Sequence, residues 1–434
     1  MDDLVLKFSQ WAENSPAFAQ VKTMVDEVGP KNLKKGSTLP APGFPEVGPL
    51  MTFNWEKTEP LKLRPFKPKY NMTMSGELEM REYGPVTVVQ CALYSDPEDN
   101  IPSRDRVRTH FLPNSLETLN PSELIPIDKT YKERIELRRE LFKSENRRNV
   151  VGVNDDDDPR IRAAVSELYT FIMGTYLPGR YPQMFKIHTV KYEQGASSVL
   201  HNMVTGEIFP TIVSPTKSTE GALETLGSNV DEDLLILLPE EKKDSKTSKD
   251  NKENDSDDDV TKYRLEAFQA AFPSGFDPAV KLGNRLNIIH GPVPGYEEKL
   301  GKSMDRYFGK LEVGKYVKRS NWSITTDGGQ LFSAFRPLHG HEGEALEARK
   351  LEKLDAEKTH LRCERQTLHR LPKSKALVFG IHTYLYPIQE IKDEGSGEEL
   401  IEATEGLAKG NNPDIQHYKL APVWSDALKT FMRE

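Results

Sequence analysis

Two adjacent segments near the C-terminal end constrain the fold more than any other part of the chain. Residues 361–374, LRCERQTLHRLPKS, have the pattern of a strand or of a strand and a turn. Residues 375–388, KALVFGIHTYLYPI, form the strongest strand pattern in the sequence. Branched and aromatic side chains of this kind favour extended backbone. We therefore expect this end of the chain to contribute strands to a sheet.

Helical patterns elsewhere predict a mixed α and β fold. Residues 131–144 and the amphipathic stretch Ile161–Tyr176 repeat apolar side chains at helical spacing, and residues 297–311 do the same. RSNWSITT (319–326) and the branched run Val86–Val89 predict further strands. The predicted class is therefore α+β.

The chain divides into three predicted parts. Residues 1–60 combine a short amphipathic helix, marked by Leu4, Phe8 and Trp11, with a Pro/Gly-rich tether. Residues 61–392 form one large domain, and residues 393–434 form an acidic, helical tail.

One insertion interrupts the large domain. The charged run Glu240–Val260 has almost no apolar side chains, so burial cannot offset the entropy lost on ordering, and we predict a disordered insertion. A regulatory phosphorylation tract is the alternative for the same run.

Composition excludes several classes of protein. The 434 residues carry a net charge of −8, which argues against a basic nucleic-acid binder. Two cysteines, Cys91 and Cys363, exclude a disulfide scaffold and a four-cysteine metal site. No apolar run is long enough for a signal peptide or a membrane span. We expect a cytoplasmic protein with no nucleic-acid or membrane partner.

Common catalytic and nucleotide-binding motifs are missing from the sequence. It has no Gly-x-Gly-x-x-Gly, Walker, Gly-x-Ser-x-Gly or His-Glu-x-x-His motif. The acidic run Asp155–Asp158 and the pair His339 and His341 are best explained as solvated loops. The basic residues between Arg362 and Lys375 alternate faces if they lie on a strand, so they make no single basic stripe.

An ordered set of blocks over about residues 61–392 resembles one family. The blocks are PFKPKYNMTM (65–74), LYTFIMGTYLPGRYPQMF (168–185), DEDLLILLP (231–239), FPSGFDPAVKLGNRLNIIHGPVPGY (272–296), MDRYFGKL (304–311), RSNWSI (319–324) and RCERQTLHRLPKSKALVFGIHTYLYPI (362–388). In order and spacing they resemble the haem-dependent oxidative N-demethylase family. The N-terminal tether, the insertion and the acidic tail depart from a compact member and suggest a eukaryotic, fungal version.

The resemblance implies a fold, a cofactor and a reaction. The fold would be PAS-like, with a curved antiparallel sheet and surrounding helices that hold haem b (iron protoporphyrin IX). The reaction would be oxidative N-demethylation of a small secondary amine such as dimethylamine. It would use O2 and electrons from a separate NAD(P)H-dependent reductase.

Four histidines are candidate axial ligands of the haem. His290 is the first choice, because it lies in a matching block between an apolar segment and the rigid turn Gly-Pro-Val-Pro-Gly. His382 is second. His369 and His188 rank below it. Relatives are expected to carry Arg as often as His at the positions of His369 and His382, which lowers the rank of these two. A structural histidine is the alternative in each case.

Three arginines are candidates for the haem propionates: Arg285, Arg306 and Arg365. A guanidinium matches a carboxylate with two parallel hydrogen bonds. An ordinary salt bridge is the alternative for each. Arg365 is favoured, because it belongs to the family-specific tetrad Glu364–Thr367.

The remaining candidates concern the substrate. Glu364 would hold a protonated amine, although neighbours on a strand point to opposite faces, so Glu364 and Arg365 are not both expected to face the haem. Tyr296 and Trp322 would line the pocket, with a core role as the alternative. A Cys363 thiolate ligand is a minor alternative to His290.

Two rival functions use the same sequence. The PAS-like fold also suits a haem-binding sensor without turnover, because a fold does not fix a function. A binding protein that has lost the haem is the third reading. An absorption spectrum would distinguish a haem-free binding protein from the two haem-binding alternatives. Formaldehyde release would distinguish the demethylase from the sensor.

Overall fold

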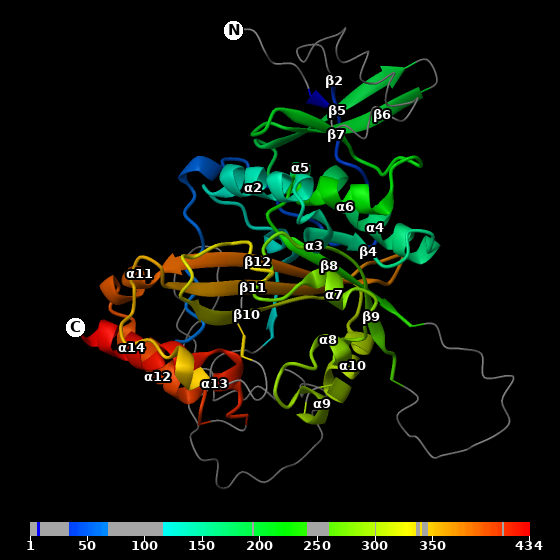
Figure 1. Ribbon diagram of the computed structural model, residues 1–434. Coiled ribbons are helices and arrows are strands. Elements are labelled where there is room, and N and C mark those ends of the chain that lie inside the picture. The colour runs from blue at the N-terminus through cyan, green and yellow to red at the C-terminus, as the bar shows by residue number, and fades with distance from the viewer. Residues whose placement is uncertain are drawn as a thin grey trace, which may run out of the picture.

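The chain folds into alternating layers of sheet and helix (Figure 1). A small sheet lies at one end, a layer of helices separates it from a large sheet, and shorter helices lie against the opposite face of the large sheet. The computed structural model describes residues 7–8, 34–67, 116–192, 195–240, 260–299, 301–335, 339–340, 346–409 and 412–434.

The large sheet is open and antiparallel throughout. It has seven strands in the order β3-β10-β11-β12-β8-β9-β4. Their bounds are Glu117–Thr118 (β3), Val151–Val153 (β4), Asp233–Pro239 (β8), Tyr263–Gln269 (β9), Tyr316–Thr325 (β10), His360–Arg370 (β11) and Leu377–Pro387 (β12). The predicted α+β class with an antiparallel sheet is confirmed, whereas its PAS-like character stays a prediction.

The two constraining segments form the centre of this sheet. They become β11 and β12, which pair along their whole length from His360↔Pro387 to Arg370↔Leu377. The predicted strand at 319–326 corresponds to β10. Strands β8 and β9 flank the insertion and pair with each other, while residues 241–259 lie outside the described residues.

Alternation along β11 divides its side chains between two faces. Thr367 and His369 point toward the helices above the sheet, where they line a cavity together with Leu168 of α4 (Pro159–Phe171). Leu368 points to the other face, where it joins Leu286 in a separate core cluster. We call these the upper face and the lower face, as they appear in Figure 1.

Helices of the N-terminal half cover the upper face. They are α2 (Tyr131–Lys143), α3 (Arg147–Val150), α4, the π-helix η6 (Ile172–Tyr176), α5 (Leu177–Arg180) and α6 (Thr219–Gly227). The helices predicted at 131–144 and Ile161–Tyr176 are confirmed. Asp158 caps α4 by accepting a hydrogen bond from the Arg160 amide, so the acidic run is the solvated loop expected there.

Four short helices lie against the lower face: α7 (Pro278–Lys281), α8 (Leu286–Ile289), α9 (Tyr296–Lys299) and α10 (Gly301–Lys310). The helix predicted at 297–311 corresponds to α9 and α10, and Leu300 between them lies outside the described residues.

The C-terminal helices close one end of the large sheet. They are α11 (Ile388–Asp393), α12 (Gly397–Gly406), α13 (Ile415–Tyr418) and α14 (Ala421–Arg433). Leu400 and Trp424 share a core cluster with Trp322 and Cys363 of the sheet. The predicted tail is therefore helical and packed on the domain.

The small sheet has the order β1-β7-β6-β5-β2. Its strands are Lys7–Phe8 (β1), Lys34–Lys35 (β2), Phe185–Tyr192 (β5), Gly195–Asn202 (β6) and Glu207–Pro210 (β7). Within the predicted N-terminal helix only Lys7–Phe8 are described, and they form a strand beside β7 rather than a helix turn. The predicted strand Val86–Val89 lies outside the described residues.

Candidate functional site

A row of polar side chains crosses the lower face of β10 and β11. The antiparallel register places Arg319 opposite Gln366 and Asn321 opposite Glu364. These four residues alternate with neighbours that point upward, so all four project from the same face. We call this set, Arg319, Asn321, Glu364 and Gln366, the polar stripe.

Hydrogen bonds in the polar stripe converge on one oxygen of Glu364. The Gln366 amide donates to Oε2 of Glu364 at 2.8 Å, and the Asn321 amide donates to the same oxygen at 3.5 Å. Arg319 Nε donates to the Gln366 side-chain oxygen at 2.6 Å. Within the described residues, Oε1 of Glu364 and the terminal nitrogens of Arg319 receive or make no hydrogen bond. They are available to a ligand.

His290 lies at the C-terminal end of α8, the helix whose Leu286 packs against the lower face. Its Nδ1 lies 2.8 Å from the Leu286 carbonyl, which fixes the proton on Nδ1 and leaves a lone pair on Nε2. Burial, assisted by the charges of Arg319 and Lys281, lowers the pKa of His290 to about 4, while the hydrogen bond to the Leu286 carbonyl opposes the shift. The imidazole is neutral at physiological pH, as a metal ligand must be.

The ring of Tyr296 fixes the plane of this imidazole. The two rings stack with centroids 4.7 Å apart and an interplanar angle of 13°. The turn Gly291–Gly295, with φ of 68° at Gly295, brings the two residues together. The Tyr296 hydroxyl donates to the sulfur of Met304 at 3.3 Å. Tyr296 therefore orients His290.

The predicted propionate partners do not lie together. Arg285 is exposed and donates to Glu240 at 2.6 Å, and Arg306 is also exposed, on α10. Arg365 is 1% exposed and points to the upper face, where it donates to the carbonyl of Glu123 at 2.6 Å. The prediction that Glu364 and Arg365 point to opposite faces is confirmed.

Trp322 and Cys363 also lie away from the polar stripe. They are cross-strand partners on the upper face and belong to the core cluster beneath the C-terminal helices. Burial raises the pKa of the Cys363 thiol far above its usual range, and its sulfur contacts only the Leu63 carbonyl, at 3.7 Å, among the hydrogen-bond partners described. The structure favours a core role for both side chains.

The other candidate histidines have different surroundings. His382 on β12 is sandwiched between carboxylates, with Nδ1 3.3 Å from Glu232 and Nε2 3.4 Å from Asp231. His188 lies on β5 of the small sheet, 5.6 Å from the ring of His201. His382 is the cross-strand partner of Arg365 and so lies on the opposite face from the polar stripe, and His188 lies in a different sheet.

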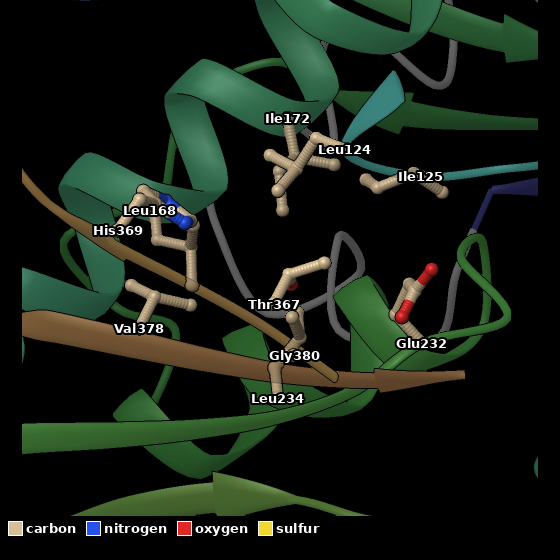
Figure 2. Close-up of a pocket in the computed structure, with 10 residues that line it drawn as sticks. All are labelled: Leu124, Ile125, Leu168, Ile172, Glu232, Leu234, Thr367, His369, Val378 and Gly380. Atoms are coloured by element: carbon tan, nitrogen blue, oxygen red, sulfur yellow. The ribbon is translucent and has the colours of Figure 1, made fainter. Parts of the chain in front are cut away.

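His369 lines an enclosed cavity between α4 and the upper face (Figure 2). Both of its ring nitrogens lack a hydrogen-bond partner in the described structure. The cavity, however, has a volume of about 10 Å³, room for about one water molecule. Figure 2 shows apolar side chains around it, with Glu232 at the end away from His369. A porphyrin does not fit there.

The loop that holds His339 is more enclosed than the sequence indicates. His339 is half-buried and its ring stacks on Tyr418 of α13 at 4.4 Å, so the expectation of a solvated loop is wrong for this residue. His341 lies outside the described residues. Across the described ranges, no group of three metal-binding side chains occurs.

Sequence reasoning singled out Glu364 but not the three side chains that surround it in the polar stripe. Arg319 and Asn321 lie in the quoted block RSNWSI, and Gln366 lies two residues after Glu364. The signal was the period of two on each strand, combined with the pairing of β10 and β11. That pairing joins residues more than forty positions apart.

One comparison with known proteins bears on this site. A family model described as "Haem-dependent oxidative N-demethylase, alpha subunit-like" matches residues 115–429. The match includes both His290 and the whole polar stripe. It also includes the C-terminal helices as far as α14. Among the described helices, none has the length and apolar character needed to cross a membrane.

Proposed function

Because this chain belongs to the haem-dependent oxidative N-demethylase, alpha subunit-like family, we propose that it removes a methyl group oxidatively from a small secondary amine. Overall, the amine, O2, two electrons and two protons would give the demethylated amine, formaldehyde and water. The electrons would come from a separate NAD(P)H-dependent reductase. The observation that carries the proposal is the presence of His290 and Glu364 on the same side of the large sheet, each with one available atom.

The residues around His290 fit haem b. A histidine that binds haem iron does so as a neutral imidazole with a free nitrogen, and His290 meets both conditions. The propionates need cations, and Arg319 is close enough to His290 to lower its pKa, while its terminal nitrogens make no hydrogen bond within the described residues. His290 would therefore hold the haem iron, and Arg319 would bind one propionate. When bound, the haem would supply the activation of O2.

Glu364 would bind the substrate nitrogen. A dialkylamine is protonated at neutral pH, so its N–H groups need an anionic acceptor. Both stripe amides donate to Oε2 of Glu364, which leaves Oε1 as the acceptor for the substrate. Because Glu364 is only 7% exposed, this contact would form where water competes poorly.

Tyr296 would orient His290, the residue that holds the haem iron, and would not touch the substrate. Its stacking against His290 leaves the imidazole little freedom to rotate, so Nε2 would keep a constant direction. This assigns Tyr296 a positioning role and leaves Glu364 as the residue that touches the substrate.

Absorption spectroscopy of His290→Ala tests the haem assignment. Wild-type protein expressed with ample iron and porphyrin precursor should show a Soret band, and the variant should lose it. His188→Ala is the matched control, because it removes an imidazole from the small sheet and should keep the band. An unchanged Soret band in His290→Ala would contradict the ligand assignment.

Formaldehyde release tests the reaction. Purified haem protein, mixed with an NAD(P)H-dependent reductase and dimethylamine, should release formaldehyde in proportion to the NAD(P)H consumed. A protein that binds haem but releases none under these conditions would instead support the sensor function.

A further inference from the structure

The C-terminal segment from Asn412 to Trp424 reaches into the candidate site. Asn412 donates from its side chain to the carbonyl of Pro294, in the turn that follows His290, at 2.5 Å. The amide of Gly340 donates to the Tyr418 carbonyl at 3.0 Å. This segment thus contacts two of the loops around the site, which makes it part of the site's construction.

Lys419 is the residue of this segment that reaches the polar stripe. It is 8% exposed, and its Nζ donates to the side-chain oxygen of Asn321 at 3.1 Å and to the Trp322 carbonyl. Strand β3 covers β10 only at Val317 and Lys318, so the edge of β10 beyond them has no strand partner among the described elements. The ammonium group of Lys419 binds one carbonyl of this edge, that of Trp322.

The backbone around Lys419 is fixed on both sides. The indole nitrogen of Trp424 donates to the Lys419 carbonyl at 3.1 Å. The next residue, Leu420, has φ of 55°, a conformation that a leucine rarely adopts and that the surrounding packing must hold. The strained conformation of Leu420 therefore helps to hold the ammonium group of Lys419 beside Asn321.

The contact between Lys419 and Asn321 determines which way the Asn321 amide points. An ammonium group only donates, and a carboxamide has one accepting end and one donating end. When Lys419 takes the oxygen of Asn321, the NH2 group of Asn321 must point away, toward Glu364. Arg319 acts on Gln366 in the same way from the other end of the polar stripe.

We propose that Lys419 is a positioning residue that fixes the amide orientation of Asn321 and so reserves Oε1 of Glu364 for the substrate amine. The role of Oε1 rests on the proposed function, whereas the coupling between Lys419 and Asn321 does not. Lys419 and Arg319, which only donate hydrogen bonds, thus orient the side-chain amides of Asn321 and Gln366. Both amides donate to Oε2 of Glu364.

The arrangement predicts sensitivity to alkaline pH. Burial lowers the pKa of Lys419 to about 8, while the charge of Glu364 opposes the shift. Above that pH the amine is neutral and can also accept a hydrogen bond, so it no longer dictates the orientation of Asn321. The titratable and charged groups that face Lys419 are Glu364, Cys363, Arg319 and His339.

Two substitutions at Lys419 separate orientation from simple packing. Lys419→Arg keeps a donor-only group and should bind dimethylamine about as well as wild type, judged by the absorption change of the haem protein. Lys419→Gln offers both a donor and an acceptor, and should raise the Kd about tenfold, as expected for a weakened hydrogen bond to a charged group. Lys429→Met, which loses only the surface pair with Glu405, is the control.

A double-mutant cycle between Lys419→Gln and Asn321→Leu completes the test. If Lys419 acts through Asn321, the substitution at 419 should have little further effect on the Kd once Asn321 is gone. The free energy of unfolding, measured by urea on the same four proteins, should be non-additive as well. This second readout needs neither haem nor substrate.

The outcomes distinguish this proposal from the proposed function. Coupled unfolding energies without any amine binding would uphold the positioning contact and contradict the demethylase function. Amine binding with additive effects in both readouts would uphold the function and overturn the role of Lys419. An unchanged Kd in Lys419→Gln would overturn it directly.

Discussion

Single side chains decide which cations are available to a ligand in this protein. Arg285 and Arg319 are both arginines near the turn of His290. Arg285 binds Glu240 at the surface, whereas within the described residues only the Nε of Arg319 makes a hydrogen bond. A guanidinium with free terminal nitrogens can bind a carboxylate with two parallel hydrogen bonds. The sequence could not show this difference, because Arg285 and Arg319 both lie in blocks that resemble the family.

We expect Arg319→Met to weaken haem retention and Arg285→Met to leave it unchanged. The methionine keeps most of the apolar stem and removes the charge, so the loss should be about tenfold to a hundredfold in haem affinity, as for one charge-assisted hydrogen-bonded pair. Transfer of haem to an excess of apomyoglobin, followed by the Soret band, measures it. Equal rates of haem loss in the two variants would contradict the assignment of Arg319.

Helices and strands were largely predictable here, and their contacts were not. The period-two pattern of β10, β11 and β12 and the helical spacing of α2 and α4 are local properties of the sequence. Glu364 and His290 were proposed from the sequence because they lie in blocks that resemble the family, whereas the role of Lys419 depends on a contact that spans 98 positions.

A buried ionic network joins α2 to the start of β8. Arg138 is fully buried and donates to Asp233 at 2.6 Å, to Asp231 at 3.2 Å and to Gln269 at 3.1 Å. Asp233 also accepts the backbone amides of Ala271 and Phe272. Asp231 and Asp233 of the block DEDLLILLP are therefore structural, and the network fixes the helical layer to the sheet.

Arg138→Met should lower the free energy of unfolding by about 3–5 kcal/mol at pH 7, because Asp233 is left as a buried charge without its partner. Burial raises the pKa of Asp233 and Arg138 opposes that rise, so the carboxyl group of the variant should take up a proton more easily. The penalty should therefore shrink as the pH falls to 5. Urea unfolding measures both values.

Arg160→Met is the matched control for this network. It removes an arginine whose pair with Asp158 lies at the surface, and it should cost less than about 1 kcal/mol. A penalty for Arg138→Met as small as that of the control would show that the network contributes little to stability.

Buried and half-buried histidines that are neutral at physiological pH lie in several layers of the described structure. His201 lies in the small sheet, His369 between the helices and the large sheet, and His290 below it. Burial lowers the pKa of His201 and His290 to about 4 and that of His369 to about 3, all below the usual value of 6.5. The unfolded chain therefore binds more protons than the folded one in this range, so stability is lost as the pH falls below 6.5.

His369→Phe tests how much of this loss comes from one buried ring. Phenylalanine keeps the stacking on Tyr316, whose ring lies 4.6 Å away, and has no nitrogen to protonate. From the difference between the folded and unfolded pKa values, His369 should account for about 2 kcal/mol of the stability lost between pH 7 and pH 5. The variant should lose that much less over the same interval, as measured by urea unfolding at both values.

Tyr316→Phe provides the control for the same aromatic contact. It changes the partner ring but removes no group that titrates between pH 5 and pH 7, so the wild-type dependence on pH should persist. His201→Phe should reduce the loss in the same direction as His369→Phe, since its folded pKa is also lowered. If His369→Phe kept the full wild-type loss, protonation of this ring would not drive acid unfolding. The sensitivity would then come from the other histidines whose pKa values are lowered to about 4, which are His201 in the small sheet and His290 and His339 close to the candidate site.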